Sequence, residues 1–215
     1  MDHSHHPAGH SDLNATRTVQ RRYKRIAGVY DKQEALPERL LFARLRRSVW
    51  SKVRGQRVLE VGVGTGKNAA YYPADVRMVA IDLVPEMATR AARRIAESDA
   101  RADVALMDAQ SLAFKDGSFD TVIATFVFCS VPDPVAGLRE LRRVLRPGGQ
   151  LLLLEHVRAE QPPVGALMDL LNPVATRMMG ANINRRTVDN VRAAGLKVTG
   201  VEKHAGIIRL IEAAL

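Results

Sequence analysis

From residue 57 onward, short apolar runs alternate with segments that have the three- and four-residue periodicity of amphipathic helices. Strand-like runs occupy 57–61, 78–82, 104–108, 119–128, 151–156, 196–202 and 207–211. Helical segments are expected between them, at 85–97, 133–144, 163–179 and 187–194. The fourth run stays apolar throughout, which is typical of a parallel strand buried on both faces. This alternation predicts an α/β fold with a doubly wound, mostly parallel seven-stranded sheet.

The chain before residue 56 has a different composition. Residues 1–15 hold four of the six histidines and predict a disordered tail, with metal binding as the alternative. Residues 16–55 predict an N-terminal extension of basic amphipathic helices, the second of them over 37–53. Between residues 17 and 57 we count thirteen Lys and Arg against three acids, a balance of +10, whereas the whole chain carries +9. An anionic partner is therefore expected for this extension alone.

The composition excludes several classes of protein. With 47% hydrophobic and 26% charged residues, the chain is typical of an ordinary globular domain. Its single cysteine, Cys129, permits no internal disulfide, so a reducing cytoplasm is the expected compartment and Cys129 is expected to be a buried small residue. The longest apolar stretch, at 122–131, is far shorter than the ~20 residues that span a bilayer.

A glycine-rich turn follows the first strand, with the pattern E-x-G-x-G-x-G from Glu60 to Gly66. Glycines let the backbone turn tightly and let a ligand approach it closely. A dinucleotide fingerprint would need glycine at position 67, which is Lys67. A carboxylate at Glu60 would repel a pyrophosphate but would suit a ligand that carries an ammonium and a sulfonium. A purely structural turn is the alternative.

Two further acids end the next two predicted strands. Asp82 is placed to accept hydrogen bonds from both hydroxyls of a ribose. Asp108 could accept from an exocyclic adenine amine while the backbone N–H of Ala109 serves a ring nitrogen, although a turn cap is the alternative for Asp108 alone. Ligands in such folds lie beyond the carboxyl ends of the strands, where all three acids are expected to meet.

Together with FDTVIA (119–124) and LRRVLRPGG (141–149), these motifs resemble the class I S-adenosylmethionine (SAM)-dependent methyltransferases over about residues 58–154. The resemblance implies a Rossmann-like domain over 56–215 with a helical insert at 163–186, and S-adenosylhomocysteine as the product. It implies that the methionine part of SAM is held by Glu60, Gly62, Gly64 and Gly66. It also implies ribose contacts from Asp82, Leu83 and Met87, adenine contacts from Asp108 and Ala109, and a methyl-transfer site lined by Thr125 and Phe126.

Shorter motifs bear on the methyl acceptor. YKRIAGVYD (23–31) resembles the N-terminal helix of quinone C-methyltransferases and of bacterial phosphatidylethanolamine N-methyltransferases, and VLEVGVGTG (58–66) is similar to the latter. TFVFCSV (125–131), LLLEHV (152–157) and the segment at 172–187 resemble proteins that methylate thiols at membranes. These relatives imply a hydrophobic or membrane-borne acceptor. Phosphatidylethanolamine is favoured, with quinone C-methylation and thiol S-methylation as alternatives.

Methyl transfer from a sulfonium needs an aligned nucleophile and a dry pocket more than a dedicated acid or base. Tyr30 and His156 are the candidate catalytic residues, and no metal site is expected. Their pocket is expected to include Phe126, Phe128 and the 163–186 insert. The N-terminal helices would act as a lid and dock on the anionic cytoplasmic face of a membrane, with Tyr and Trp as interfacial anchors. A nucleic-acid-binding protein or methyltransferase is the alternative from another class, disfavoured by the few aromatic residues.

Overall fold

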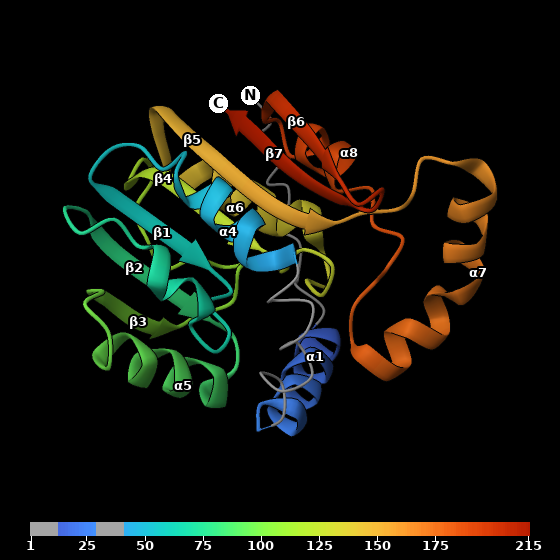
Figure 1. Ribbon diagram of the computed structural model, residues 1–215, viewed down its shortest axis with the longest axis horizontal. Coiled ribbons are helices and arrows are strands. Elements are labelled where there is room, and N and C mark those ends of the chain that lie inside the picture. The colour runs from blue at the N-terminus through green and yellow to red at the C-terminus, as the bar shows by residue number, and fades with distance from the viewer. Residues whose placement is uncertain (1–12, 29–40) are drawn as a thin grey trace, which may run out of the picture.

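The computed structural model describes residues 13–28 and 41–215, built around a seven-stranded sheet of order β3-β2-β1-β4-β5-β7-β6 (Figure 1). Strands β1 to β5 pair in parallel, and β7 runs antiparallel to both β5 and β6. The predicted doubly wound, mostly parallel sheet is confirmed. The strands are β1 (Arg57–Val61), β2 (Arg77–Asp82), β3 (Ala102–Leu106), β4 (Phe119–Thr125), β5 (Leu145–His156), β6 (Lys197–His204) and β7 (Ile208–Ala214).

The strand order reverses at β1, which pairs with β2 on one side and with β4 on the other. In open α/β sheets, the crossovers leave in opposite directions at such a point and open a crevice beyond the carboxyl ends of the strands. The glycine-rich turn after Val61, Asp82 at the end of β2 and Thr125 at the end of β4 all reach this edge.

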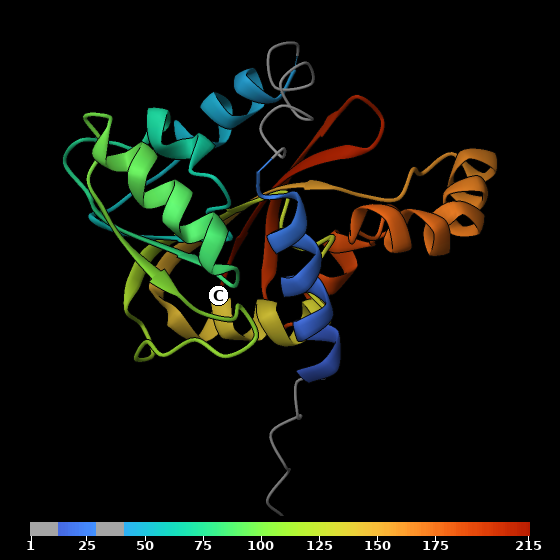
Figure 2. The same cartoon turned by 90° about the horizontal axis from the view of Figure 1, so that it is seen from below.

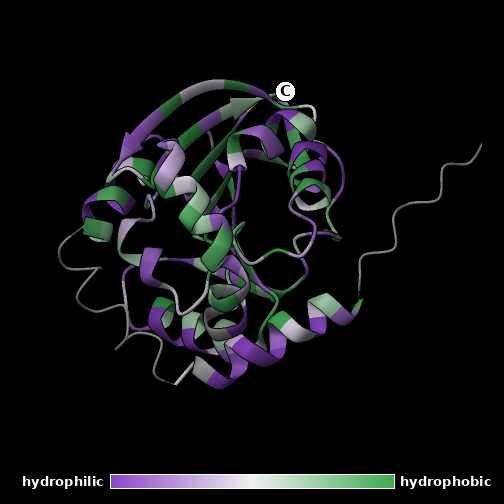
Figure 3. Ribbon diagram, turned by 90° about the vertical axis from the view of Figure 1, so that its right-hand side faces the viewer, coloured by the Kyte–Doolittle hydropathy of each residue, from purple (hydrophilic) through white to green (hydrophobic). Residues whose placement is uncertain are grey.

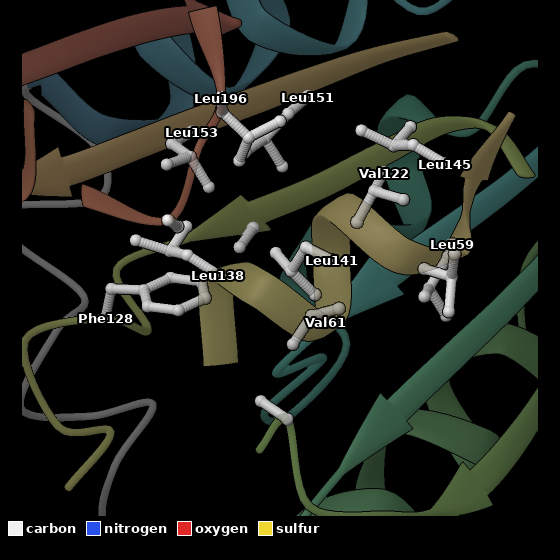
Figure 4. Packing of buried hydrophobic residues seen from close by; sticks show 14 of the residues in the cluster. Leu59, Val61, Val122, Phe128, Leu138, Leu141, Leu145, Leu151, Leu153 and Leu196 are labelled. Atoms are coloured by element: carbon white, nitrogen blue, oxygen red, sulfur yellow. The ribbon is translucent and has the colours of Figure 1, made fainter. Parts of the chain in front are cut away.

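Helices cover both faces of the sheet. On one face, α4 (Ala43–Trp50) buries its apolar side, including Val49 and Trp50, against strand residues such as Ile123 and Leu152. The other face is covered by α6 (Pro134–Val144) and α8 (Thr187–Ala193). Figure 4 shows Leu138 and Leu141 of α6 among the buried side chains of this second cluster.

The remaining helical elements lie at different places around the sheet. They are α1 (Leu13–Ile26), the 3₁₀ helix η2 (Lys67–Tyr71), α5 (Pro85–Ala96) and α7 (Pro162–Met179). Proline at the first helical position starts α5 and α6, because its missing N–H would have no partner there. In both Figures 1 and 2, α7 stands away from the sheet, between the segment that leads to it from β5 and the segment that continues to α8.

Several predicted boundaries were wrong at the ends of the elements. Strand β3 ends at Leu106, so Asp108 lies in the following turn, where it forms an isolated bridge with Ser111. Strand β4 ends at Thr125 because Phe126 has a φ of +59°, which no extended strand accommodates. Helix α1 begins at Leu13, so residues 13–15 are not part of a disordered tail.

The predicted extension at 16–55 does not behave as one unit. Its second helix packs into the core, and Trp50 is only 2% exposed beside the ring of Tyr72. Trp50 therefore cannot be an interfacial anchor, because its apolar surface is buried within the fold. Residues 1–12 of the predicted tail and Tyr30 lie outside the described residues. Over the described part of the chain, no helix has the length and apolar character needed to cross a membrane.

Candidate active site

A cavity opens at the carboxyl ends of β1, β2 and β4, with α1 forming part of its wall through Val19 and Tyr23. The space between its walls that no atom occupies, including space open to solvent, is about 920 Å³. Most of the predicted ligand residues line it: Gly62, Gly64, Asp82, Leu83, Met87, Asp108, Ala109, Thr125 and Phe126. The structure therefore brings residues from four successive strand ends to one place.

The three glycines of the turn have positive φ angles, but their surroundings differ. A Cβ on Gly62 would lie 2.4 Å from a methyl carbon of Val127, and one on Gly66 would lie 2.9 Å from Cα of Ala91. These two glycines allow close packing inside the protein. A Cβ on Gly64 would meet no atom within 4 Å, so only this glycine leaves its open side to a ligand.

Asp82 fixes the turn and keeps acceptor capacity for a ligand. Its Oδ2 accepts from the backbone N–H of Gly64 at 2.8 Å, and its Oδ1 accepts from that of Val84 at 2.9 Å. Burial raises the pKa of Asp82, and these backbone donors oppose the rise. A carboxylate has about four acceptor sites, so both oxygens can still accept from a diol.

Asp108 sits where α1 meets the sheet. Its carboxylate accepts from the side-chain amide of Gln110, at 3.1 Å to each oxygen, and from the hydroxyl of Thr16 at 3.5 Å. The next residue, Ala109, is buried and also lines the cavity. Helix α1 thus closes over the end of the cavity where the sequence predicts the adenine.

Glu60 does not line the cavity. It is fully buried behind the glycine turn, where one oxygen accepts from Asn68 Nδ2 at 2.5 Å and the other from the hydroxyl of Tyr72. Burial raises the pKa of Glu60, and its hydrogen bonds with Tyr72 and Asn68 oppose that rise. The carboxylate supports the turn through this network and is absent from the cavity lining, so its predicted contact with the methionine part stays a prediction.

Arg46 is a site residue that the sequence reasoning missed, because it was counted among the surface cations. It is 6% exposed, lines the cavity, and donates from Nη1 to Asn68 Oδ1 and to Thr125 Oγ1, both at 2.9 Å. Its guanidinium also lies 5.4 Å from the ring centroid of Phe126. A signal was present, since Arg46 lies one helical turn before Trp50, on the side of α4 that carries the apolar residues.

The turn after β4 forms the opposite wall, and a buried acid holds it. Glu155 Oε1 accepts from the backbone N–H groups of Val127 and Phe128 at 2.9 and 3.0 Å, and burial raises the pKa of Glu155 to about 7. Tyr23 of α1 joins this wall through a 2.9 Å hydrogen bond between its hydroxyl and that of Ser130, and both residues line the cavity.

The predicted acceptor residues are only partly brought together. Phe126 lines the cavity, but the ring of His156 packs against Phe126 at 4.7 Å between centroids and is not part of the lining drawn from the described residues. Phe128 is fully buried in the core and does not line the cavity. Cys129 is buried as predicted, and burial raises its pKa to about 12, so its thiol is a poor nucleophile.

Comparisons with known proteins agree with this geometry. A family profile described as a methyltransferase domain matches residues 59–153. The phosphatidylethanolamine N-methyltransferase of Cereibacter sphaeroides is 37% identical over 155 residues, which cover 69% of this chain and 73% of that protein. The chain belongs to the SAM-dependent methyltransferase family.

One further relative supports the same assignment, and one solved structure shows the same fold. The human thiol S-methyltransferase TMT1A is 37% identical to this methyltransferase over 139 residues, which cover 63% of the chain and 57% of that protein. A SAM-dependent methyltransferase from Thermotoga maritima has the same fold, with a TM-score of 0.72 at 22% identity over 91% of this chain and 99% of that one.

The methyl donor is SAM, and the cavity fits it. The open side of Gly64 leaves room for a ligand against the turn, and Asp82 retains acceptors for a ribose diol beside it. When bound, SAM supplies a methyl group activated by the positive sulfonium. The chain's part is to bind the donor, align the acceptor and exclude water.

Proposed function

We propose that this methyltransferase methylates the amine head group of a lipid-like, membrane-borne acceptor, phosphatidylethanolamine first. The observation that carries the proposal is the position of α1. Its inner side lines the cavity with Val19 and Tyr23, and its outer side exposes Arg17, Arg21 and Arg25 at four-residue spacing. A cavity bordered by a cationic helix suits a head group that lies among anionic phosphates.

The cofactor would be held mainly by the turn and the strand ends. Asp82 would accept from the ribose hydroxyls, with Leu83 and Met87 beside the sugar. Asp108 and Ala109 would hold the adenine, and Gly64 would lie against the methionine part.

The remaining lining would prepare the acceptor nitrogen. Apolar side chains such as Val127 and Val131 line the cavity at the turn after β4. Such a lining favours the neutral form of an amine and excludes water. The nitrogen lone pair forms the new N–C bond as the S–C bond breaks, and the methylated amine later releases a proton. Tyr30 and His156 remain predicted catalytic residues, with His156 as the predicted base, and Tyr23 with Ser130 is a further polar pair at the lining.

The proposed docking on the cytoplasmic face of a membrane uses only part of the basic segment. Lys24 pairs with Glu86 at 2.9 Å, and Arg22 donates to the carbonyl of Thr176 in α7 at 2.6 Å. Arg17, Arg21 and Arg25 are exposed and are the cations best placed to meet anionic lipid. Each would contribute about 1 kcal/mol near such a surface.

An acceptor screen tests the chemistry. Labelled SAM is supplied with vesicles of phosphatidylethanolamine, with a menaquinol precursor, and with alkyl thiols, using Asp82→Ala as the control that should be slow with every acceptor. We expect label in the phospholipid fraction. Label confined to thiols would replace the proposal with S-methylation, which the similarity to the human thiol S-methyltransferase supports as the second candidate. Label in RNA would point to a nucleic-acid substrate.

A charge-matched pair of variants tests the docking. Changing Arg17, Arg21 and Arg25 to Gln should weaken sedimentation with anionic vesicles by roughly a hundredfold, at about 1 kcal/mol for each charge. The control removes three exposed cations that lie outside α1, Arg101, Lys115 and Arg139, and should change little. Equal losses in both variants would mean that only net charge matters, and the assignment to α1 would be wrong.

A further inference from the structure

Helix α7 exposes a row of aliphatic side chains to solvent, which is unusual for a helix on the surface of a protein in water. Five aliphatic side chains are between 45% and 75% exposed: Val164, Leu167, Leu170, Leu171 and Val174. They recur at three- and four-residue spacing and so form one side of the helix, which we call the α7 face. Exposed patches of this kind mark interaction sites.

The opposite side of α7 is held to the protein by polar contacts. Asp169 accepts two hydrogen bonds from Arg158 Nε and one from Arg158 Nη2, at 2.8–3.1 Å, and one from Asn184. Asn172 accepts from the backbone N–H of Ile183 at 2.9 Å and donates to Asn182. The only acid of α7 is therefore paired on the other side of the helix, and none of the five residues of the α7 face is charged.

The segment that follows α7 connects this helix to the rim of the cavity. Asn182 donates its backbone and side-chain N–H groups to the carbonyl of Cys129, and Arg185 donates to the carbonyl of Val131, which lines the cavity. Arg22 of α1 donates to Thr176 at the other end of α7. A partner that covers the α7 face would thus lie next to the mouth of the site.

We propose that the α7 face inserts into the acyl region of a lipid bilayer that carries anionic head groups, and so sets this enzyme on its membrane. The inference deepens the proposed function, since it names the surface on which a lipid acceptor would be met. An interfacial helix needs one apolar side beside cationic residues. Exposed Arg177 lies in the last turn of α7, and exposed Arg25 lies one turn of α1 beyond Arg22. Figure 3 shows α1 largely hydrophilic and α7 with hydrophobic segments along its length.

A second copy of the chain fits the α7 face less well. The stretch from Val164 to Val174 rises only about 15 Å, whereas a specific dimer takes roughly 800 Å² from each partner. Two copies meeting here would also bring two arginine-rich α1 helices together in a chain of net charge +9. An anionic bilayer would both bury the apolar side of α7 and attract the arginines beside it.

The test removes the apolar side without touching the core. In a triple variant, Leu167→Ser, Leu170→Ser and Val174→Ser, binding to vesicles of phosphatidylcholine and phosphatidylglycerol should fall roughly a thousandfold, since each immersed aliphatic side chain contributes about tenfold. The matched control is Leu106→Ser with Val201→Ser, two aliphatic residues that are 56% and 37% exposed in β3 and β6. The control should bind as the wild type does.

A label reports insertion directly. Leu170→Cys labelled with an environment-sensitive dye should shift to the blue with vesicles and be quenched by spin-labelled acyl chains, while buried Cys129 stays unlabelled. Vesicle binding without a blue shift would overturn the inference. So would a monomer–dimer equilibrium that the triple variant abolishes, which would assign the α7 face to a second copy.

The soluble acceptor separates this inference from the proposed function. The triple variant should still methylate a short-chain, water-soluble ethanolamine analogue at the wild-type rate. Loss of that activity in a folded variant would overturn the inference in favour of a lid over the acceptor. If the wild type inserts α7 into vesicles but methylates no phospholipid, the proposed function fails and the docking surface stands.

Discussion

The cavity has two walls that are built in different ways. The loop wall consists of residues 61–65, 82–84 and 107–109. The hydrogen bonds that shape its turns join residues close in the sequence, such as Asp82 to Gly64 over 18 positions and Gln110 to Asp108 over two. The helix wall consists of α1, Arg46 and the turn at 126–131. Its contacts are long-range, such as Tyr23 to Ser130 over 107 positions.

This difference separates what each wall can specify. The loop wall is fixed by strand ends and glycines, so it presents the same acceptors and the same open space whatever packs above it. The helix wall depends on tertiary contacts, including those of Arg46 with Thr125 over 79 positions and Arg22 with Thr176 over 154. Changes in the loop wall should therefore alter the binding of the methyl donor. Changes in the helix wall should alter the binding of the methyl acceptor and the stability of the turn at 126–131.

The largest expected effect lies within the loop wall. Both Gly62→Ala and Gly64→Ala place a Cβ on a left-handed backbone, which costs about 1–2 kcal/mol. Only Gly62→Ala also meets Val127, so its total loss of unfolding free energy should be about 3–5 kcal/mol. Urea unfolding of both variants measures the difference. Gly64→Ala should fold well but bind S-adenosylhomocysteine at least tenfold more weakly, and unaltered binding would mean that this side of the turn faces no ligand.

Glu155 tests the helix wall through pH. Its pKa is raised from 4.5 to about 7, so the folded protein holds a proton that the unfolded chain releases. Stability from this group is fully present below pH 4.5 and is lost as pH rises toward and through 7, on the order of 3 kcal/mol in all. Urea unfolding at pH 5 and pH 8.5 should show this loss in the wild type and a smaller one in Glu155→Gln. An equal loss in both would assign it to another group.

The sequence was sufficient for most of the loop wall. Strand β1 has the predicted bounds and β2 differs by one residue, because each is an apolar run between a charged start and an acid or glycine that ends it. The third strand was predicted two residues too late. Met107 continues the apolar run, but it is already in the turn and packs against the core from there. The apolar pattern of a sequence indicates which residues are buried, and buried residues continue past the end of this strand.

The helix wall was largely beyond sequence reasoning. Arg46 carries the same charge as the exposed arginines around it, and only the fold shows that its partners are Asn68 and Thr125. Glu155 ends a buried strand without any local partner, since the N–H groups that it accepts from belong to a turn 27 or 28 residues earlier. Trp50 fitted an interfacial anchor by composition until its burial was known.

Asp82→Ala tests the donor side at intermediate cost. The variant leaves a ligand diol without its charged acceptor, a loss of roughly 1.5–3 kcal/mol in binding. Calorimetric titration with S-adenosylhomocysteine should show affinity lower by at least tenfold while the circular dichroism spectrum of the fold is retained. Because Asp82 also accepts from Gly64, Asp82→Asn is the milder companion, and it should recover part of the affinity. Wild-type affinity in the alanine variant would refute the ribose assignment.

Asp108→Asn gives the smallest expected effect, and it probes the place where the two walls meet. The amide keeps one acceptor oxygen, but its NH₂ group presents donors to the amide of Gln110, to Thr16 and to an adenine amine. We expect SAM to bind about fivefold more weakly, by about 1 kcal/mol, with turnover at saturating SAM nearly unchanged.

Thr16→Val serves as the comparison, since it removes only the contact from α1. If Thr16→Val weakens binding as much as Asp108→Asn, then the adenine end is held by the closure of α1 more than by the carboxylate. The helix wall would in that case contribute to donor affinity as well as to acceptor choice. A collapse of turnover in Asp108→Asn at unaltered SAM affinity would instead make Asp108 part of the chemistry, and its place in the loop wall would have to be reassigned.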